Sequence, residues 1–116
     1  MPSKELHIFK AEHNKKFLDS VINGNEEYND WSATVIFYCA VHLVEAYFAE
    51  KGEHHTKHVD RKKAMKCESE LASVMVSYKA IESLSKAARY DCVVITKEKI
   101  TSSKAKLLYL EKCLPK

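Results

Sequence analysis

The segment WSATVIFYCAVHLVEAYFA, residues 31–49, contains fifteen apolar residues among nineteen. Asn29 or Asp30 can cap a helix at its start, and Gly52 can close it about Lys51 in the left-handed conformation that glycine tolerates. A helix that is apolar on nearly all sides must be buried. We therefore expect a central helix from about residue 29 to 51, with the rest of the chain packed around it.

The same segment approaches the length of a membrane-spanning helix, which needs about 20 apolar residues. However, Ser32, Thr34, His42 and Glu45 interrupt it, and ionisable groups are costly inside a membrane. The N-terminal residues 1–5 lack the basic stretch followed by an apolar one that marks a secretory signal. These features predict no membrane helix and a cytoplasmic location.

Amphipathic patterns flank the central segment. Residues 4–23 predict a helix, ended by Asn23-Gly24-Asn25, because apolar or aromatic positions recur there at steps of three and four. Residues 57–66 predict a short basic helix. A long helix should begin at Leu71, with an a/d series at positions 71, 74, 78, 81, 85, 88 and 92. The face of the first helix would carry Leu6, Phe9, His13, Phe17 and Val21.

The last predicted helix follows a short extended connection at residues 93–95, and Thr96 can cap it. One side of that helix would carry Ile100, Leu107, Leu110 and Leu114. The chain has 116 residues with only two Gly and two Pro, and no segment alternates with the period of a strand. We therefore expect one domain, residues 1–116, with an all-α, up-down bundle of four to five helices.

The number of predicted helices bears on how the protein assembles, and the distribution of charged residues bears on what it could bind. Three other long helices are too few to cover the central helix on every side and also bury their own apolar faces, which predicts a homodimer with a twofold helical interface. Residues 1–58 hold six Lys/Arg and nine Asp/Glu, whereas residues 59–116 hold thirteen and seven. The basic half could bind a polyanion, or it could be a solvated lysine-rich surface.

The four cysteines, at positions 39, 67, 92 and 113, form no C-x-x-C pair. They are typical of reduced core thiols rather than of a zinc site. With two glycines, the chain cannot form a phosphate-binding P-loop. We expect no metal and no cofactor.

The central helix carries one polar stripe, Thr34, Tyr38, His42 and Glu45, at spacings of four, four and three. It could line a ligand cleft in which His42 and Glu45 transfer protons. It could equally form a hydrogen-bonded seam against the first helix or a symmetry mate. The seam is favoured, because buried polar groups are usually paired.

Two further clusters lie in the second half of the chain. Three histidines, His54, His55 and His58, lie just before and at the start of the short basic helix, but a metal would need another ligand that this segment does not offer. His58 and Arg61, three residues apart, can act together on a phosphate. Arg89, near the end of the long helix, can pair with a nearby carboxylate or with an anionic ligand.

The sequence resembles the HEPN domain superfamily, and more narrowly its small stand-alone prokaryotic members. The resemblance is carried by residues 30–33, 37–47 and 58–61, by Tyr78 and by residues 85–91. It implies a bundle of four or five helices, frequent homodimerisation and a role near RNA or nucleotides. Known roles in the superfamily include metal-independent ribonucleases, toxin partners of minimal nucleotidyltransferases and noncatalytic helpers.

The chain departs from the ribonuclease members at one point. Those members carry an Arg followed four to six residues later by His, whereas all six histidines here precede both Arg61 and Arg89. His58 before Arg61 is the remaining, reversed candidate for a catalytic pair.

The leading hypothesis is therefore a noncatalytic, dimeric module that binds a nucleotide or RNA. The candidate phosphate- or nucleotide-binding residues are His58, Arg61, Arg89, Tyr38, His42 and Tyr90. The alternative is a toxin-type ribonuclease, in which His58 or His42 takes the 2′-hydroxyl proton and Arg61 or Arg89 stabilises the phosphate. A third hypothesis is a structural partner subunit of a nucleotidyltransferase.

Overall fold

The computed structural model describes residues 1–114, except for the side chain of Val21. Within this range the chain forms five α-helices and no strand. This confirms the all-α prediction. The helices are α1 (Lys4–Phe17), extended by a π-helical turn (Leu18–Ile22), α2 (Asn29–Ala49), α3 (His58–Lys66), α4 (Ala72–Tyr90) and α5 (Lys97–Cys113); short 3₁₀ turns cover Glu26–Tyr28 and Ser69–Leu71.

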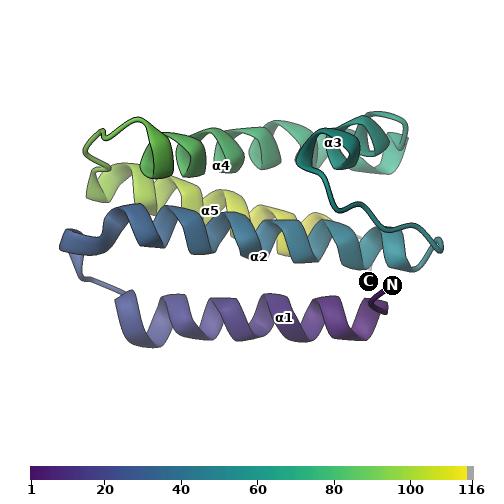
Figure 1. Cartoon of the computed structure of the whole chain (residues 1–116), viewed down its shortest axis with the longest axis horizontal. Helices are drawn as coiled ribbons and strands as arrows, with labels where there is room; N and C mark the ends of the chain where they lie inside the picture. Colours follow the sequence, from purple (N-terminus) through teal and green to yellow (C-terminus); the bar gives the residue numbers. More distant parts are fainter. Residues whose placement is uncertain (115–116) are drawn as a thin grey trace.

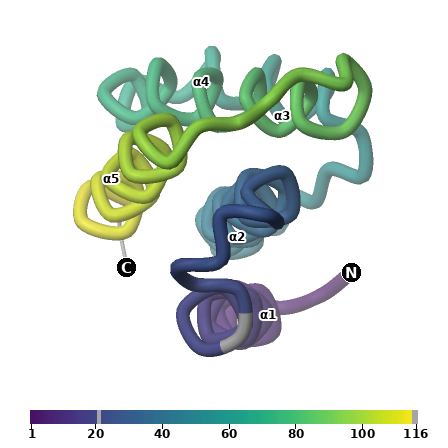
Figure 2. Tube along the Cα trace, turned by 90° about the vertical axis from the view of Figure 1, so that its left-hand side faces the viewer, coloured from purple at the N-terminus to yellow at the C-terminus, as the bar shows by residue number. Residues whose placement is uncertain are grey.

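The four long helices run alternately in opposite directions, as in an up-down bundle (Figure 1). Helix α2 lies in the middle, with α1 on one side and α4 and α5 on the other (Figure 2). Most of α2 is buried, including Ile36, Phe37 and Phe48. The central position of α2 is confirmed. The chain's own helices cover most of α2 and leave Trp31 and Tyr38 partly exposed, so the homodimer stays a prediction.

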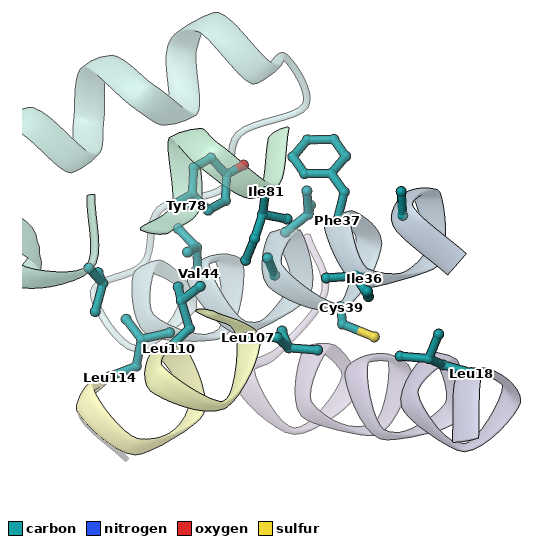
Figure 3. Close-up of a cluster of buried hydrophobic side chains, with 14 of the residues drawn as sticks. Leu18, Ile36, Phe37, Cys39, Val44, Tyr78, Ile81, Leu107, Leu110 and Leu114 are labelled. Atoms are coloured by element: carbon teal, nitrogen blue, oxygen red, sulfur yellow. The ribbon is translucent and has the colours of Figure 1, made fainter. Parts of the chain in front are cut away.

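The core forms where α2 meets α4 and α5, and Leu18 and Cys39 extend it toward the N-terminal helix (Figure 3). Tyr78 and Ile81 of α4 and Leu107 and Leu110 of α5 are fully buried there. The predicted a/d series of α4 is buried from position 71 to 85, becomes half-buried at 88 and is exposed at 92. Thr96 caps α5, as expected, through a hydrogen bond from the backbone N–H of Lys99 to its hydroxyl.

Helix α1 packs through a different face from the predicted one. Leu6 and Phe9 are 61% and 68% exposed, and His13 and Phe17 are also at the surface; the side chain of Val21 lies outside the described part. The buried row consists instead of His7, Ala11, Leu18 and Ile22. Both rows have helical spacing, and the small Ala11 lets the backbone of α1 approach α2, where Cys39 Sγ lies 3.7 Å from the Ala11 carbonyl oxygen.

The cysteines fulfil the expectation only in part. All four are free, but Cys67 and Cys92 are exposed and Cys113 is half-buried. Only Cys39 is fully enclosed, and burial raises the pKa of its thiol to about 12. Cys67 is the C-cap residue of α3, and Cys92 follows the end of α4.

One helical stretch, Glu26–Ala49, is long and apolar enough to cross a membrane by length and composition. However, 72% of its most apolar window is buried against the other helices. The stretch is therefore the core helix of a compact globular fold.

Candidate functional site

Glu45, on α2, is a buried carboxylate at the centre of a polar cluster. Its Oε2 lies 2.7 Å from Arg61 Nε and 3.1 Å from His55 Nδ1, and its Oε1 accepts the backbone N–H of His55 at 2.9 Å. Burial by itself would raise the pKa of Glu45, but the N–H of His55 and the Arg61 guanidinium hold this pKa below its usual value. This cluster ties α3 and the loop before it to α2.

Arg61 is inside the fold rather than at its surface, with only 3% of its area exposed. Besides the ion pair with Glu45, its Nη1 lies 2.8 Å from His58 Nδ1, and its Nη2 donates to the carbonyl of His55 at 2.7 Å. A phosphate could reach this guanidinium only by displacing protein partners. The geometry therefore gives Arg61 a role in positioning His58 and the loop.

The contact with Arg61 fixes the state of His58. A guanidinium can only donate hydrogen bonds, so Nδ1 of His58 must accept and the ring proton must sit on Nε2. Burial lowers the pKa of His58, and the positive charge of Arg61 lowers it further. At neutral pH, His58 is therefore a neutral ring with one N–H donor and no free lone pair for a general base.

His58 and Arg89 both pack against the ring of Phe37. The ring centres of His58 and Phe37 are 5.1 Å apart, and the Arg89 guanidinium lies 5.7 Å from the Phe37 centre. The guanidinium also lies 5.3 Å from the ring of Tyr90, and Nη1 donates to the hydroxyl of Ser85. These contacts bring α3 and α4 together over α2.

Two exposed tyrosines flank this cluster. Tyr38 is 42% exposed, with its ring centre 5.8 Å from that of Phe37, and Tyr90 is 73% exposed. We call His58, Arg89, Tyr38 and Tyr90 together the Phe37 surface. Exposed aromatic rings can stack on nucleic-acid bases, and a guanidinium can bind a phosphate through paired N–H groups. Of the three guanidinium nitrogens of Arg89, only Nη1 donates to an acceptor among the described residues. The N–H groups on the other two nitrogens can therefore bind a ligand.

His42 belongs to a separate cluster. Its Nδ1 lies 3.0 Å from Nδ1 of His7, on α1, so one ring donates to the other. Of the predicted polar stripe, His42 alone forms the expected hydrogen bond to the first helix: Thr34 bonds within α2, and Glu45 pairs with Arg61 and His55. Burial lowers the pKa of His42 to about 4, with a further contribution from His7, and burial also lowers the pKa of His7. His7 was not identified as a candidate from the sequence. It lies on the buried row of α1, next to the small residue Ala11, and not on the row of larger apolar residues that was predicted to be buried.

The structure thus brings together four of the six candidate binding residues, at the Phe37 surface. Arg61 is buried and connected to that surface through His58. His42 instead contacts α1. No protein-family model matches the chain, and comparisons with curated proteins and with solved structures give no match.

Proposed function

We propose that this protein is a HEPN-like, noncatalytic module that binds RNA or a nucleotide in the cytoplasm. The observation that carries the proposal is the pairing of His58 and Arg89 on the ring of Phe37. A phosphate oxygen can accept from Arg89 and from His58 Nε2–H, while bases stack on Tyr38 or Tyr90. The helical bundle and the excess of basic residues in positions 59–116 are consistent with such a ligand.

The state of His58 favours binding over cleavage. Metal-independent RNA cleavage needs an acceptor for the 2′-hydroxyl proton. In this arrangement Nδ1 of His58 is occupied by Arg61 and Nε2 carries the proton. His42 contacts His7. The ribonuclease alternative would therefore require His58 to leave Arg61.

Removing the Arg89 guanidinium should weaken binding to RNA. A charged hydrogen bond contributes about 1.5–3 kcal/mol, so Arg89→Ala should raise Kd by roughly 10- to 150-fold for a labelled single-stranded RNA. Arg89→Lys keeps the charge but loses the planar fork, and should recover only part of the affinity. Fluorescence anisotropy at two salt concentrations, with ATP as competitor, measures both the loss and the salt dependence.

Lys79→Ala is the matched control, because it removes one exposed positive charge from the same helix outside the Phe37 surface. We expect it to bind nearly as well as the wild type, and we expect no RNA cleavage with or without divalent metal. Equal affinities of the wild type and Arg89→Ala would exclude this binding site. Cleavage that disappears in a folded His58→Ala variant would establish the ribonuclease alternative.

We also propose that the protein is a homodimer, with α1 as the interface. Leu6, Phe9 and Phe17, with His13 between them, form a largely apolar row on α1 that no other part of the described chain covers. Pairing this row with its copy around a twofold axis would bury it. The row is continuous along one helix, whereas other exposed apolar side chains, such as Val76 and Val94, lie on different elements.

A charge placed in the middle of this row should break the dimer. We expect light scattering to give twice the chain mass of 13.3 kDa for the wild type, and the chain mass for Phe9→Lys at the same micromolar concentration. The control is Val94→Lys, which adds the same charge at an 84% exposed position outside α1. A monomeric wild type, or a dimer that survives Phe9→Lys, would contradict this interface.

A further inference from the structure

A second polar cluster, separate from the Phe37 surface, lies between α1, α2 and the loop that joins α2 to α3. His7, Glu45 and His54 each offer one ligand atom, and the three atoms lie within 4.8 Å of one another. Nδ1 of His54 is 3.4 Å from Oε1 of Glu45. Zinc binds such atoms at about 2.0–2.1 Å in a tetrahedron, whose ligand atoms are therefore about 3.4 Å apart. This separation suits two ligands of one ion.

His7 supplies independent support. Only 4% of its area is exposed, and its Nε2 has no hydrogen-bond partner among the described residues. A buried polar nitrogen without a partner is rare in folded proteins and needs an explanation. The other nitrogen, Nδ1, contacts His42 at 3.0 Å. This is the arrangement in which a metal-bound histidine is oriented by a hydrogen bond on its far side.

Glu45 can bind an ion and still keep Arg61. Its Oε2 contacts Arg61 and the His55 ring, whereas Oε1 accepts one hydrogen bond, from the backbone of His55. A carboxylate oxygen has two acceptor positions, so Oε1 retains one for a metal. His54 is 27% exposed at its side chain and gives an ion access from solvent.

We infer that His7, Glu45 and His54 form a binding site for a divalent transition-metal ion, with zinc the best fit. Two imidazoles and one carboxylate suit zinc and its neighbours rather than magnesium or calcium, which prefer oxygen ligands. Three protein ligands leave one position for water. The ion would fasten the loop and α1 to α2. The histidine-rich loop offered no complete ligand set by itself; the fold adds His7 and Glu45 from two other helices.

The test is zinc binding by the full chain after treatment with a chelator. One equivalent of zinc should bind, and Tm should rise by roughly 5–10 °C when free zinc exceeds Kd about 100-fold. His54→Ala should keep the Tm of the metal-free wild type but lose this rise, because His54 is at the surface. His7→Gln should lower the zinc affinity at least about 10-fold, which a site within the loop alone would not show.

Glu12→Gln is the matched control, since it removes an exposed possible metal ligand of α1 that lies outside the cluster and outside the row proposed as the dimer interface, and it should keep the full response to zinc. Cobalt provides a second readout: nitrogen and oxygen ligands give visible d–d bands without a sulfur-to-cobalt charge-transfer band. A wild type without a zinc response would overturn the proposal. So would a response that persists in His54→Ala and His7→Gln, or a charge-transfer band that assigns the metal to the exposed Cys67 and Cys92.

Discussion

Replacing Arg61 with alanine is expected to destabilise the fold by about 3–5 kcal/mol, the usual cost of leaving one partner of a buried ion pair alone. Glu45 is 1% exposed and would lose its 2.7 Å contact with Arg61 Nε. His58 and the carbonyl of His55 would lose a hydrogen bond each. Urea unfolding followed by circular dichroism at neutral pH measures the change in the free energy of unfolding.

Lys63→Ala serves as the control, because Lys63 is an exposed positive residue of the same helix. Its effect should stay within about 0.5 kcal/mol. The double variant Glu45→Leu/Arg61→Met should lose less stability than Arg61→Ala, since neither charge then remains buried alone. A loss below about 1 kcal/mol in Arg61→Ala would contradict the structural role. So would a weakened RNA affinity in Arg61→Ala with an unchanged free energy of unfolding.

Acidification from pH 7 to 4 should destabilise the metal-free protein strongly. The pKa of His42 is about 4 in the fold, against an ordinary value of 6.5. Between these values the unfolded chain binds the proton and the folded chain does not, so stability falls as the pH drops below about 6.5. At about 1.4 kcal/mol per pKa unit, His42 contributes at most about 3 kcal/mol, and solvent around this half-buried ring reduces that amount.

Other groups act in the same direction. The pKa values of His7 and His58 are lowered by burial, so these rings also resist protonation in the fold. Glu45 has a pKa below its ordinary value of 4.5, so its contribution is lost when the pH falls through its folded pKa. Acid unfolding should therefore begin near pH 6 and steepen below about pH 4.5.

The histidine contribution can be isolated with His42→Phe. This variant should show a shallower fall in urea midpoint between pH 6.5 and 4.5, because one titrating ring is gone. Val76→Ala, which changes an exposed residue that does not titrate, should keep the slope of the wild type. Equal slopes in wild type and His42→Phe would show that His42 is not held neutral by its burial against His7.

The fold was largely predictable because two helices carry unambiguous patterns. Helix α2 is apolar around its circumference and had to be central, and the a/d series of α4 is buried from Leu71 to Ser85. Helix α1 was not predictable in the same way. It has two rows with helical spacing, and the larger one, with Leu6 and Phe9, is the one outside the chain's own core. A periodic pattern indicates a face, but not what covers it.

The candidate site was predictable in its residue types but not in their roles. Spacing suggested that His58 and Arg61 share a helical face, and they do contact each other. However, spacing could not show that Arg61 turns inward to Glu45, or that Arg89 reaches the ring of Phe37 from another helix. His7 gave no signal, since its partners, His42 and His54, come from distant parts of the sequence.

The one-sided packing of α1 also bears on how the molecule opens. Helix α2 is enclosed by α1, α4 and α5, whereas α1 rests chiefly on α2, with an ion pair from Lys15 to Glu111 of α5 (Figure 2). Within a single chain, an element held from one side detaches at a lower free energy than the core, as a separate cooperative unit. Its detachment would uncover His42 and remove His7 from Glu45 and His54. The same opening transition therefore detaches α1 and takes apart the cluster of His7, Glu45 and His54.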